Sequence, residues 1–165
     1  MDGLHTIFSN PSPFRGGSLD QRSQVNARLK SCATLEIGVQ AWLEVPLVDP
    51  DERALRKAKI VAVSGGAEAA VIDRLRARVL HLTQAAGHKR IAVVSPDAGN
   101  GKSVVACNLA ISLSQRPNMD VALIDVDLRR PSIREVLALP AGPDLLAPLF
   151  EGASVRDQLV RVGSS

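Results

Sequence analysis

The chain contains no tyrosine, and aromatic residues make up only 2% of its 165 residues. Proteins that hold single-stranded nucleic acid stack its bases on aromatic rings, so nucleic-acid binding is disfavoured despite a formal net charge of +3. Two cysteines are too few for a disulfide framework. Neither a run of 18 apolar residues nor a signal-peptide core is present, so we expect a cytoplasmic protein.

Composition divides the chain into three stretches. Residues 1–34 mix proline, glycine, serine and amide side chains with few periodic apolar residues, which is typical of a poorly ordered tail. Residues 35–66 are expected to be a linker, with a charged helix at 51–59 and a short strand at 60–63. Residues 67–165 are expected to form the N-terminal part of an α/β domain.

Two local patterns predict helices. Apolar residues at helical spacing predict a helix over residues 67–84 that Gly87 ends, with four side chains on its buried face: Ile72, Leu75, Val79 and Leu82. Three arginines fall elsewhere on this helix and are expected in solvent: Arg74, Arg76 and Arg78. Ser132 and Ser154 are each followed three residues later by an acidic residue, which predicts that they cap two short helices.

A glycine-containing loop follows the β-branched segment Ile91–Val94. It runs Ser95-Pro-Asp-Ala-Gly-Asn-Gly-Lys-Ser103 and leads into a predicted helix over residues 102–115. This order of elements suits a triphosphate, because the loop N–H groups and the helix N-terminus converge on phosphate oxygens. Lys102 would neutralise the β- and γ-phosphates, and the Ser103 hydroxyl would ligate Mg²⁺. The loop therefore predicts nucleotide binding.

The apolar segment 121–125 ends in the motif Asp125-Val-Asp127. Two residues apart on a strand, the two carboxylates point the same way, at the carboxyl edge of a parallel sheet where ligands bind. Alone, the motif also suits a solvated turn, but one helix after a phosphate loop it indicates a metal–phosphate site. Segments 91–94, 102–115 and 121–125 are thus expected to form one right-handed parallel βαβ unit.

These motifs resemble those of the bacterial tyrosine kinases and their capsule- and exopolysaccharide-associated relatives, within the deviant Walker ATPases. The matching stretches are Ser95–Ser103, Asn108-Leu-Ala110 and Leu123–Pro131, and a weaker likeness covers residues 35–160, with a juxtamembrane-like stretch at its start. The resemblance implies a P-loop NTPase-like parallel sheet with flanking helices, and ATP and Mg²⁺ as cofactors. It also implies a membrane-anchored polysaccharide co-polymerase or adaptor as partner at the inner face of the plasma membrane, and self-association into a homo-oligomer.

The resemblance further assigns roles to individual residues. Lys102, Asp125 and Asp127 would be catalytic, with Asp127 accepting a phenol proton, and Ser103 and Asp125 would hold the metal. The phosphate cradle would be eight consecutive residues: Asp97, Ala98, Gly99, Asn100, Gly101, Lys102, Ser103 and Val104. Phosphoryl transfer is mostly positioning and charge stabilisation, so these groups would supply most of the local chemistry.

The sequence departs from the family pattern in three places. Pro96 stands where the first glycine of the loop is usual, and no apolar strand ending in aspartate (the Walker B motif) follows Asp127. The tyrosine-rich tail of the kinases is also missing, so any phenol acceptor would belong to another protein. The sheet is therefore expected to be incomplete, as in a truncated domain.

Two alternatives to a kinase-like domain remain open. A non-catalytic remnant or adaptor-binding module ranks second, favoured by the missing motifs. A partitioning ATPase similar to ParA or MinD, working as a nucleotide-switched dimer, ranks third, because such proteins carry a loop lysine where this chain has Asp97. The sequence thus favours an ATP-binding, kinase-like ancestry and leaves the activity of the chain open.

Overall fold

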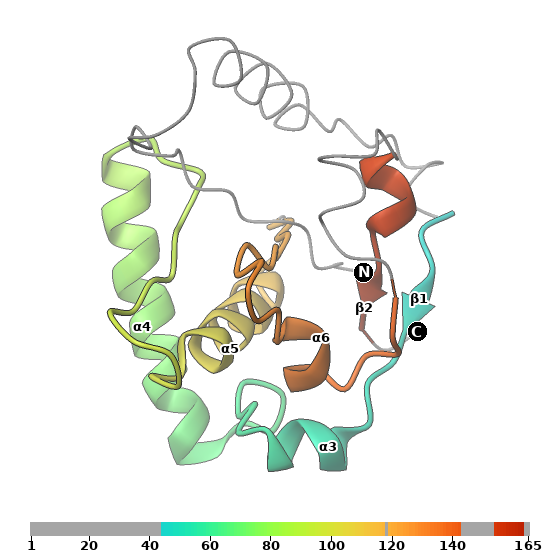
Figure 1. Cartoon of the computed structure of the whole chain (residues 1–165). Helices are drawn as coiled ribbons and strands as arrows, with labels where there is room; N and C mark the ends of the chain where they lie inside the picture. The colour runs from blue at the N-terminus through green and yellow to red at the C-terminus, as the bar shows by residue number, and fades with distance from the viewer. Residues whose placement is uncertain (1–43, 118, 143–153, 164–165) are drawn as a thin grey trace, which may run out of the picture.

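The computed structural model describes residues 44–117, 119–142 and 154–163. The elements in chain order are β1 (Leu47–Val48), α3 (Glu52–Lys57), α4 (Gly66–Ala85), α5 (Lys102–Ser114), α6 (Ile133–Val136), the 3₁₀ helix η2 (Val155–Gln158) and β2 (Arg161–Val162). In Figure 1, α5 lies at the centre, with α4 on one side and α6 on the other. The tail predicted for residues 1–34 lies outside the described residues.

One small parallel sheet is formed by the described residues. Strand β1 pairs with β2, so that Leu47 lies opposite Arg161 and Val48 opposite Val162. The pairing predicted between segments 91–94 and 121–125 is not found, because the first is extended without ladder bonds and the second holds only isolated bridge positions at 121 and 122. Side chains of both segments, Ile91 of the first and Val121 and Leu123 of the second, pack on α5, and both segments line one cavity.

The strand predicted for residues 60–63 is also absent, and a turn stands in its place. The buried Asn108 side chain explains this difference. Its Oδ1 accepts the N–H groups of Val61 and Ala62 at 2.8 and 3.0 Å, and its Nδ2 donates to the Lys59 and Val104 carbonyls, both at 2.9 Å. One amide on α5 therefore supplies the partners that a neighbouring strand would supply, and the turn needs no ladder.

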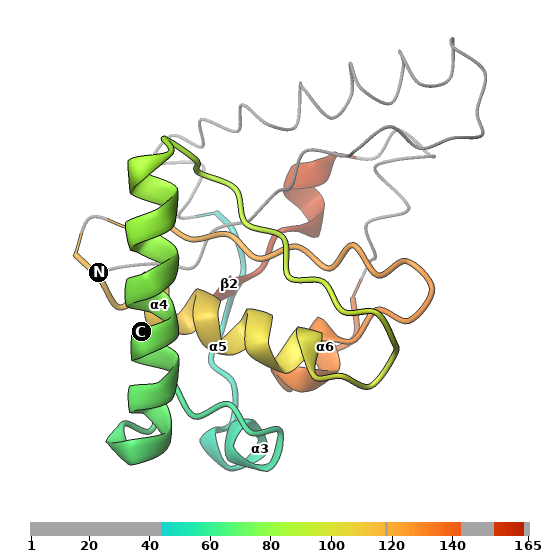
Figure 2. The same ribbon diagram turned by 90° about the vertical axis from the view of Figure 1, so that its left-hand side faces the viewer.

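Helix α4 confirms the helix predicted over residues 67–84, but its buried face differs from the prediction. Leu75 and Leu82 are exposed, at 36% and 56%, whereas Arg76 lies against α5. Arg76 Nη1 donates to the Ser112 carbonyl and hydroxyl oxygens at 2.9 Å, and the Ser112 hydroxyl donates to Asp73 at 2.8 Å. Val79 of the predicted face does pack on the α5 cluster, together with Leu80. Where α4 and α5 cross (Figure 2), polar and apolar contacts therefore hold the two helices together.

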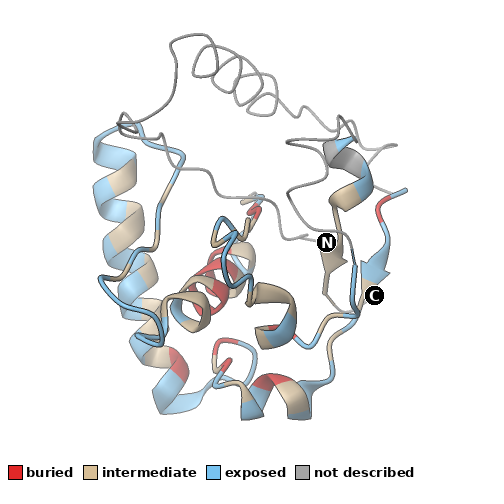
Figure 3. Ribbon diagram, in the orientation of Figure 1, coloured by how far each residue is buried: buried red, intermediate tan, exposed pale blue. Residues whose placement is uncertain are grey.

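The core surrounds the second half of α5, where the buried residues gather (Figure 3). One cluster joins Leu55 and Ile60 to Cys107 and Leu137, and a second joins four residues: Leu109, Ala110, Leu113 and Val121. The first cluster draws the segment expected to be a linker into the same core as α5 and α6. Burial, with a contribution from the charge of Asp125, raises the pKa of the Cys107 thiol to about 12, so Cys107 is an inert packing residue.

One further predicted element is present. The charged helix expected at 51–59 is confirmed as α3, which Asp51 caps by accepting the N–H groups of Arg53 and Ala54 at 3.3 and 3.1 Å. No helix among the described residues is long and apolar enough to cross a membrane.

Candidate functional site

The loop before α5 leaves the N-terminus of this helix open. The Ser95 hydroxyl donates to the Asp97 carbonyl at 2.7 Å and closes the first turn of the loop. Gly99 and Gly101 have φ angles of +82° and +77°, a region that disfavours other residues. Gly101 is also the N-cap, so no side chain of the described residues caps α5. The N–H groups of its first turn, at the positive end of the helix dipole, are available to an anion.

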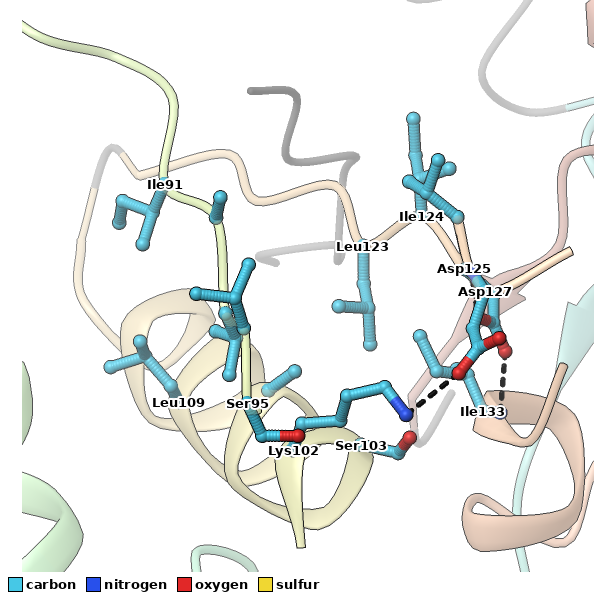
Figure 4. Close-up of a pocket in the computed structure, with 15 residues that line it drawn as sticks. Ile91, Ser95, Lys102, Ser103, Leu109, Leu123, Ile124, Asp125, Asp127 and Ile133 are labelled. Atoms are coloured by element: carbon cyan, nitrogen blue, oxygen red, sulfur yellow. Dashed lines mark hydrogen bonds and ion pairs between the residues drawn. The ribbon is translucent and has the colours of Figure 1, made fainter. Parts of the chain in front are cut away.

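A cavity of about 360 Å³ opens beside this helix end (Figure 4). Its walls are the extended segments 91–95 and 123–127, which run along its two sides, with Ala106 and Leu109 of α5 and Ile133 of α6 completing the lining. Lys102 and Ser103 reach it from α5, and Asp125 and Asp127 reach it from the opposite segment. The structure therefore brings together the four side chains that were predicted to carry the chemistry.

Lys102 and Asp127 form an ion pair across this cavity. The ammonium nitrogen lies 2.7 Å from Asp127 Oδ2, and the two side chains are 29% and 27% exposed. The hydrogen bond from Lys102 is the main cause that lowers the pKa of Asp127, and the N–H of Arg130, 3.2 Å from Oδ1, adds to it. A carboxylate with a lowered pKa is a weak base. Asp127 would therefore accept a proton readily only after Lys102 has moved to another anion.

Asp125 is occupied by three backbone donors. Its Oδ2 accepts the N–H groups of Ser132 and Ile133 at 2.6 and 2.9 Å, and its Oδ1 accepts the N–H of Asp127 at 3.1 Å. The short helix predicted after Ser132 is present as α6, with Ser132 at the N-cap position, but the Ser132 side chain does not make the predicted capping bond. Asp125 caps α6 from seven residues upstream, and its charge makes it the stronger acceptor.

The Ser103 and Ser132 hydroxyl oxygens lie 2.7 Å apart and form a hydrogen bond. This contact joins the start of α5 to the start of α6. Sequence reasoning missed Ser132 as a site residue because its local pattern resembles an ordinary helix cap. The available signal was its place a few residues beyond the Asp-x-Asp motif, on the segment that turns back toward the phosphate loop.

The rest of the predicted cradle lies beside the cavity without lining it. Residues 97–101 are exposed, and Val104 is half-buried and packs against the core cluster of Leu55 and Ile60. The described residues contain no group of three or more histidine, cysteine, aspartate or glutamate side chains that could hold a metal ion. Mg²⁺, which is bound by one or two protein groups with phosphates and waters, fits the hydroxyl and carboxylate oxygens that meet here.

Comparison with protein families gives one match, to the ParA family described as NUBPL iron-transfer P-loop NTPase, over residues 87–148. The matched range includes the glycine loop, α5, the Asp-x-Asp segment and α6. No curated protein and no solved structure matches the chain. The match does not single out the tyrosine kinases. The helices with a small parallel sheet agree with an α/β fold of this type, although the sheet of the described residues has only two strands. The match over residues 87–148 thus supports a P-loop NTPase superfamily for this part of the chain.

Proposed function

We propose that the chain binds ATP with Mg²⁺ at the cavity between α5 and the Asp-x-Asp segment. The observation that carries this proposal is the meeting of Lys102 and Ser103, at an uncapped helix N-terminus, with two carboxylates across one cavity. The N-terminal N–H groups and Lys102 would hold phosphate oxygens, and Ser103 would bind the metal. Mg²⁺, when bound, offsets the charge of the β- and γ-phosphates.

Binding requires a change of partners at Lys102. In the structure its ammonium group is paired with Asp127 at 2.7 Å, so a phosphate must compete with this carboxylate. A triphosphate carries more negative charge than Asp127 and meets the helix dipole as well, which favours the exchange. The ion pair therefore holds Lys102 at the cavity in the absence of ligand.

The test is calorimetry of Mg–ATP binding to the wild type and to Lys102→Met. A charge-assisted contact of roughly 1.5–3 kcal/mol predicts a loss of about 10- to 100-fold in affinity. Lys57→Met, on the exposed last turn of α3, is the matched control and should bind as the wild type does. Equal affinity of Lys102→Met and the wild type would remove the phosphate-loop assignment.

Within the superfamily, we propose a ParA-type ATPase that changes its association state with nucleotide. The family match over residues 87–148 supports this alternative, which the sequence motifs had ranked last. The family description names iron transfer. Among the described residues the one cysteine of this chain, Cys107, is buried with a raised pKa, whereas the thiolate is the form that binds metals.

A tyrosine-kinase-like function is the second candidate, and Asp97 favours it. This residue occupies the place of the loop lysine of partitioning ATPases, and it is exposed rather than aimed into the cavity. Sedimentation with and without ATP, together with transfer of labelled phosphate to poly(Glu,Tyr), separates the two candidates. ATP-dependent dimers support the ParA type, whereas Lys102-dependent phosphotyrosine supports the kinase type, acting on another protein.

A further inference from the structure

The hydrogen bond between Ser103 and Ser132 bears directly on how a metal would be held. The two hydroxyl oxygens are 2.7 Å apart, and both residues are partly buried. A hydroxyl that ligates a cation does so through an oxygen lone pair, so its proton must point away from the metal. It needs an acceptor on that side, because a partly buried hydroxyl proton without a partner is costly.

Ser132 is placed to be that acceptor. Its backbone N–H donates to Asp125 at 2.6 Å, the shortest of the three bonds to this carboxylate, which fixes the position of the residue. Its side chain makes no capping bond to α6, so the hydroxyl oxygen is not needed by the helix. Among the described residues, Ser132 is the side chain that bonds the Ser103 hydroxyl.

We propose that Ser132 is a positioning residue of the Mg²⁺ site. Its hydroxyl oxygen accepts the Ser103 proton and so turns a lone pair of Ser103 toward the metal. Asp125 acts through the same residue, since it holds the Ser132 backbone and need not touch the cation to organise the site. This inference rests on the proposed binding of Mg–ATP and adds the residue that orients its metal ligand.

The experiment titrates Mg²⁺ into the full chain at a fixed concentration of a fluorescent N-methylanthraniloyl ATP, followed by fluorescence. Ser132→Ala should weaken the apparent Mg²⁺ affinity about three- to tenfold, the value of one neutral hydrogen bond, and should change metal-free nucleotide binding by less than about twofold. Ser132→Thr keeps a hydroxyl at this position. It should restore the Mg²⁺ affinity to within about twofold of the wild type.

Ser114→Ala is the matched control, because the Ser114 hydroxyl donates to the Ile111 carbonyl at the other end of α5. It should leave the Mg²⁺ titration unchanged. Thermal melts check folding, and Ser132→Ala keeps both N–H bonds to Asp125.

Three outcomes overturn the inference. A Ser132→Ala curve equal to that of the wild type means that Ser103 needs no acceptor. Tighter Mg²⁺ binding means that Ser132 competes with the metal. A Thr variant as weak as the Ala variant means that the loss came from repacking. These results are distinct from failure of the proposed function, which shows in the wild type itself as nucleotide binding that is absent or independent of Lys102 and which removes both proposals.

Discussion

The two halves of α5 differ in how their polar groups are satisfied. Residues 107–113 are almost entirely buried, and Asn108 and Ser112 have partners for their side-chain polar atoms within the protein. At the other end, Lys102 and Ser103 are partly exposed, and no described side chain caps the helix. The buried half is held by hydrogen bonds within the protein, and the N-terminal half keeps polar groups that a ligand can bind. A helix can serve both purposes because its N-terminus has N–H groups without helical partners, whereas its interior has none.

The largest expected effect that tests this contrast is at Asn108. Asn108→Ala leaves the N–H groups of Val61 and Ala62 without their acceptor and should lower the free energy of unfolding by roughly 2–5 kcal/mol, because each buried orphan donor costs about 1–3 kcal/mol. Urea unfolding followed by circular dichroism measures it. Gln115→Ala is the control, since Gln115 bonds the Ala62 carbonyl at 3.0 Å but is exposed.

Gln115→Ala should cost less than about 1 kcal/mol. If the two variants are equally stable, the turn at residues 60–63 does not depend on Asn108. The hydrogen bonds of the buried half of α5 would then contribute less to stability than expected.

A smaller effect is expected at the polar contact between α4 and α5. Ser112→Ala and Arg76→Ala each remove part of one network, so their effects should not add. A double-mutant cycle should give a coupling energy of about 1 kcal/mol, within the range for residues that share hydrogen bonds. The exposed Arg74 and Arg78 provide controls, and Ser112→Ala combined with Arg78→Ala should be additive. If the effects of Ser112→Ala and Arg76→Ala on stability were additive as well, Arg76 would have the solvent-exposed role predicted from sequence.

The smallest expected effect concerns the ion pair between Lys102 and Asp127, at the N-terminal end of α5. Because Lys102 lowers the pKa of Asp127 in the folded chain, the pair stabilises the fold above the unfolded pKa of about 4 and loses this contribution as pH falls through the lower, folded value. The difference in melting temperature between the wild type and Asp127→Asn should therefore be constant from about pH 5 to 8 and shrink below about pH 4. A difference that grows on acidification would contradict the sign of the pKa shift.

The helices and the motif residues that line the cavity were predictable from sequence, because both rest on local patterns. Spacing of apolar residues is enough to place α4, and the Gly101-Lys102-Ser103 motif marks the start of α5. Hydrogen bonds between residues of different elements were harder to predict from sequence. Arg76 turned inward because Ser112 of α5 offers it two oxygen acceptors, and the sequence of α4 does not predict them.

The same reason explains the differences in strands and caps. A β-branched run such as residues 60–63 forms a strand only where a neighbouring strand exists, and here the Asn108 amide takes that place. Ser132 has the local pattern of a cap, but the carboxylate of Asp125 folds back onto the same N–H group that Glu135 would have accepted. In each case a side chain outside the local pattern supplied the hydrogen bonds in place of the locally expected partner.

Asp125 carries a consequence for how this chain diverges in evolution. Its carboxylate joins the segment after residue 121 to the start of α6 through the N–H groups of Ser132 and Ile133, so replacing it would disturb folding before any ligand is considered. Under the proposed function, selection for a folded chain and selection for an organised metal site would therefore act on one side chain. A descendant that no longer bound nucleotide would still need this aspartate in order to fold. Loss of nucleotide binding is therefore better judged from substitutions at Lys102 and Ser103.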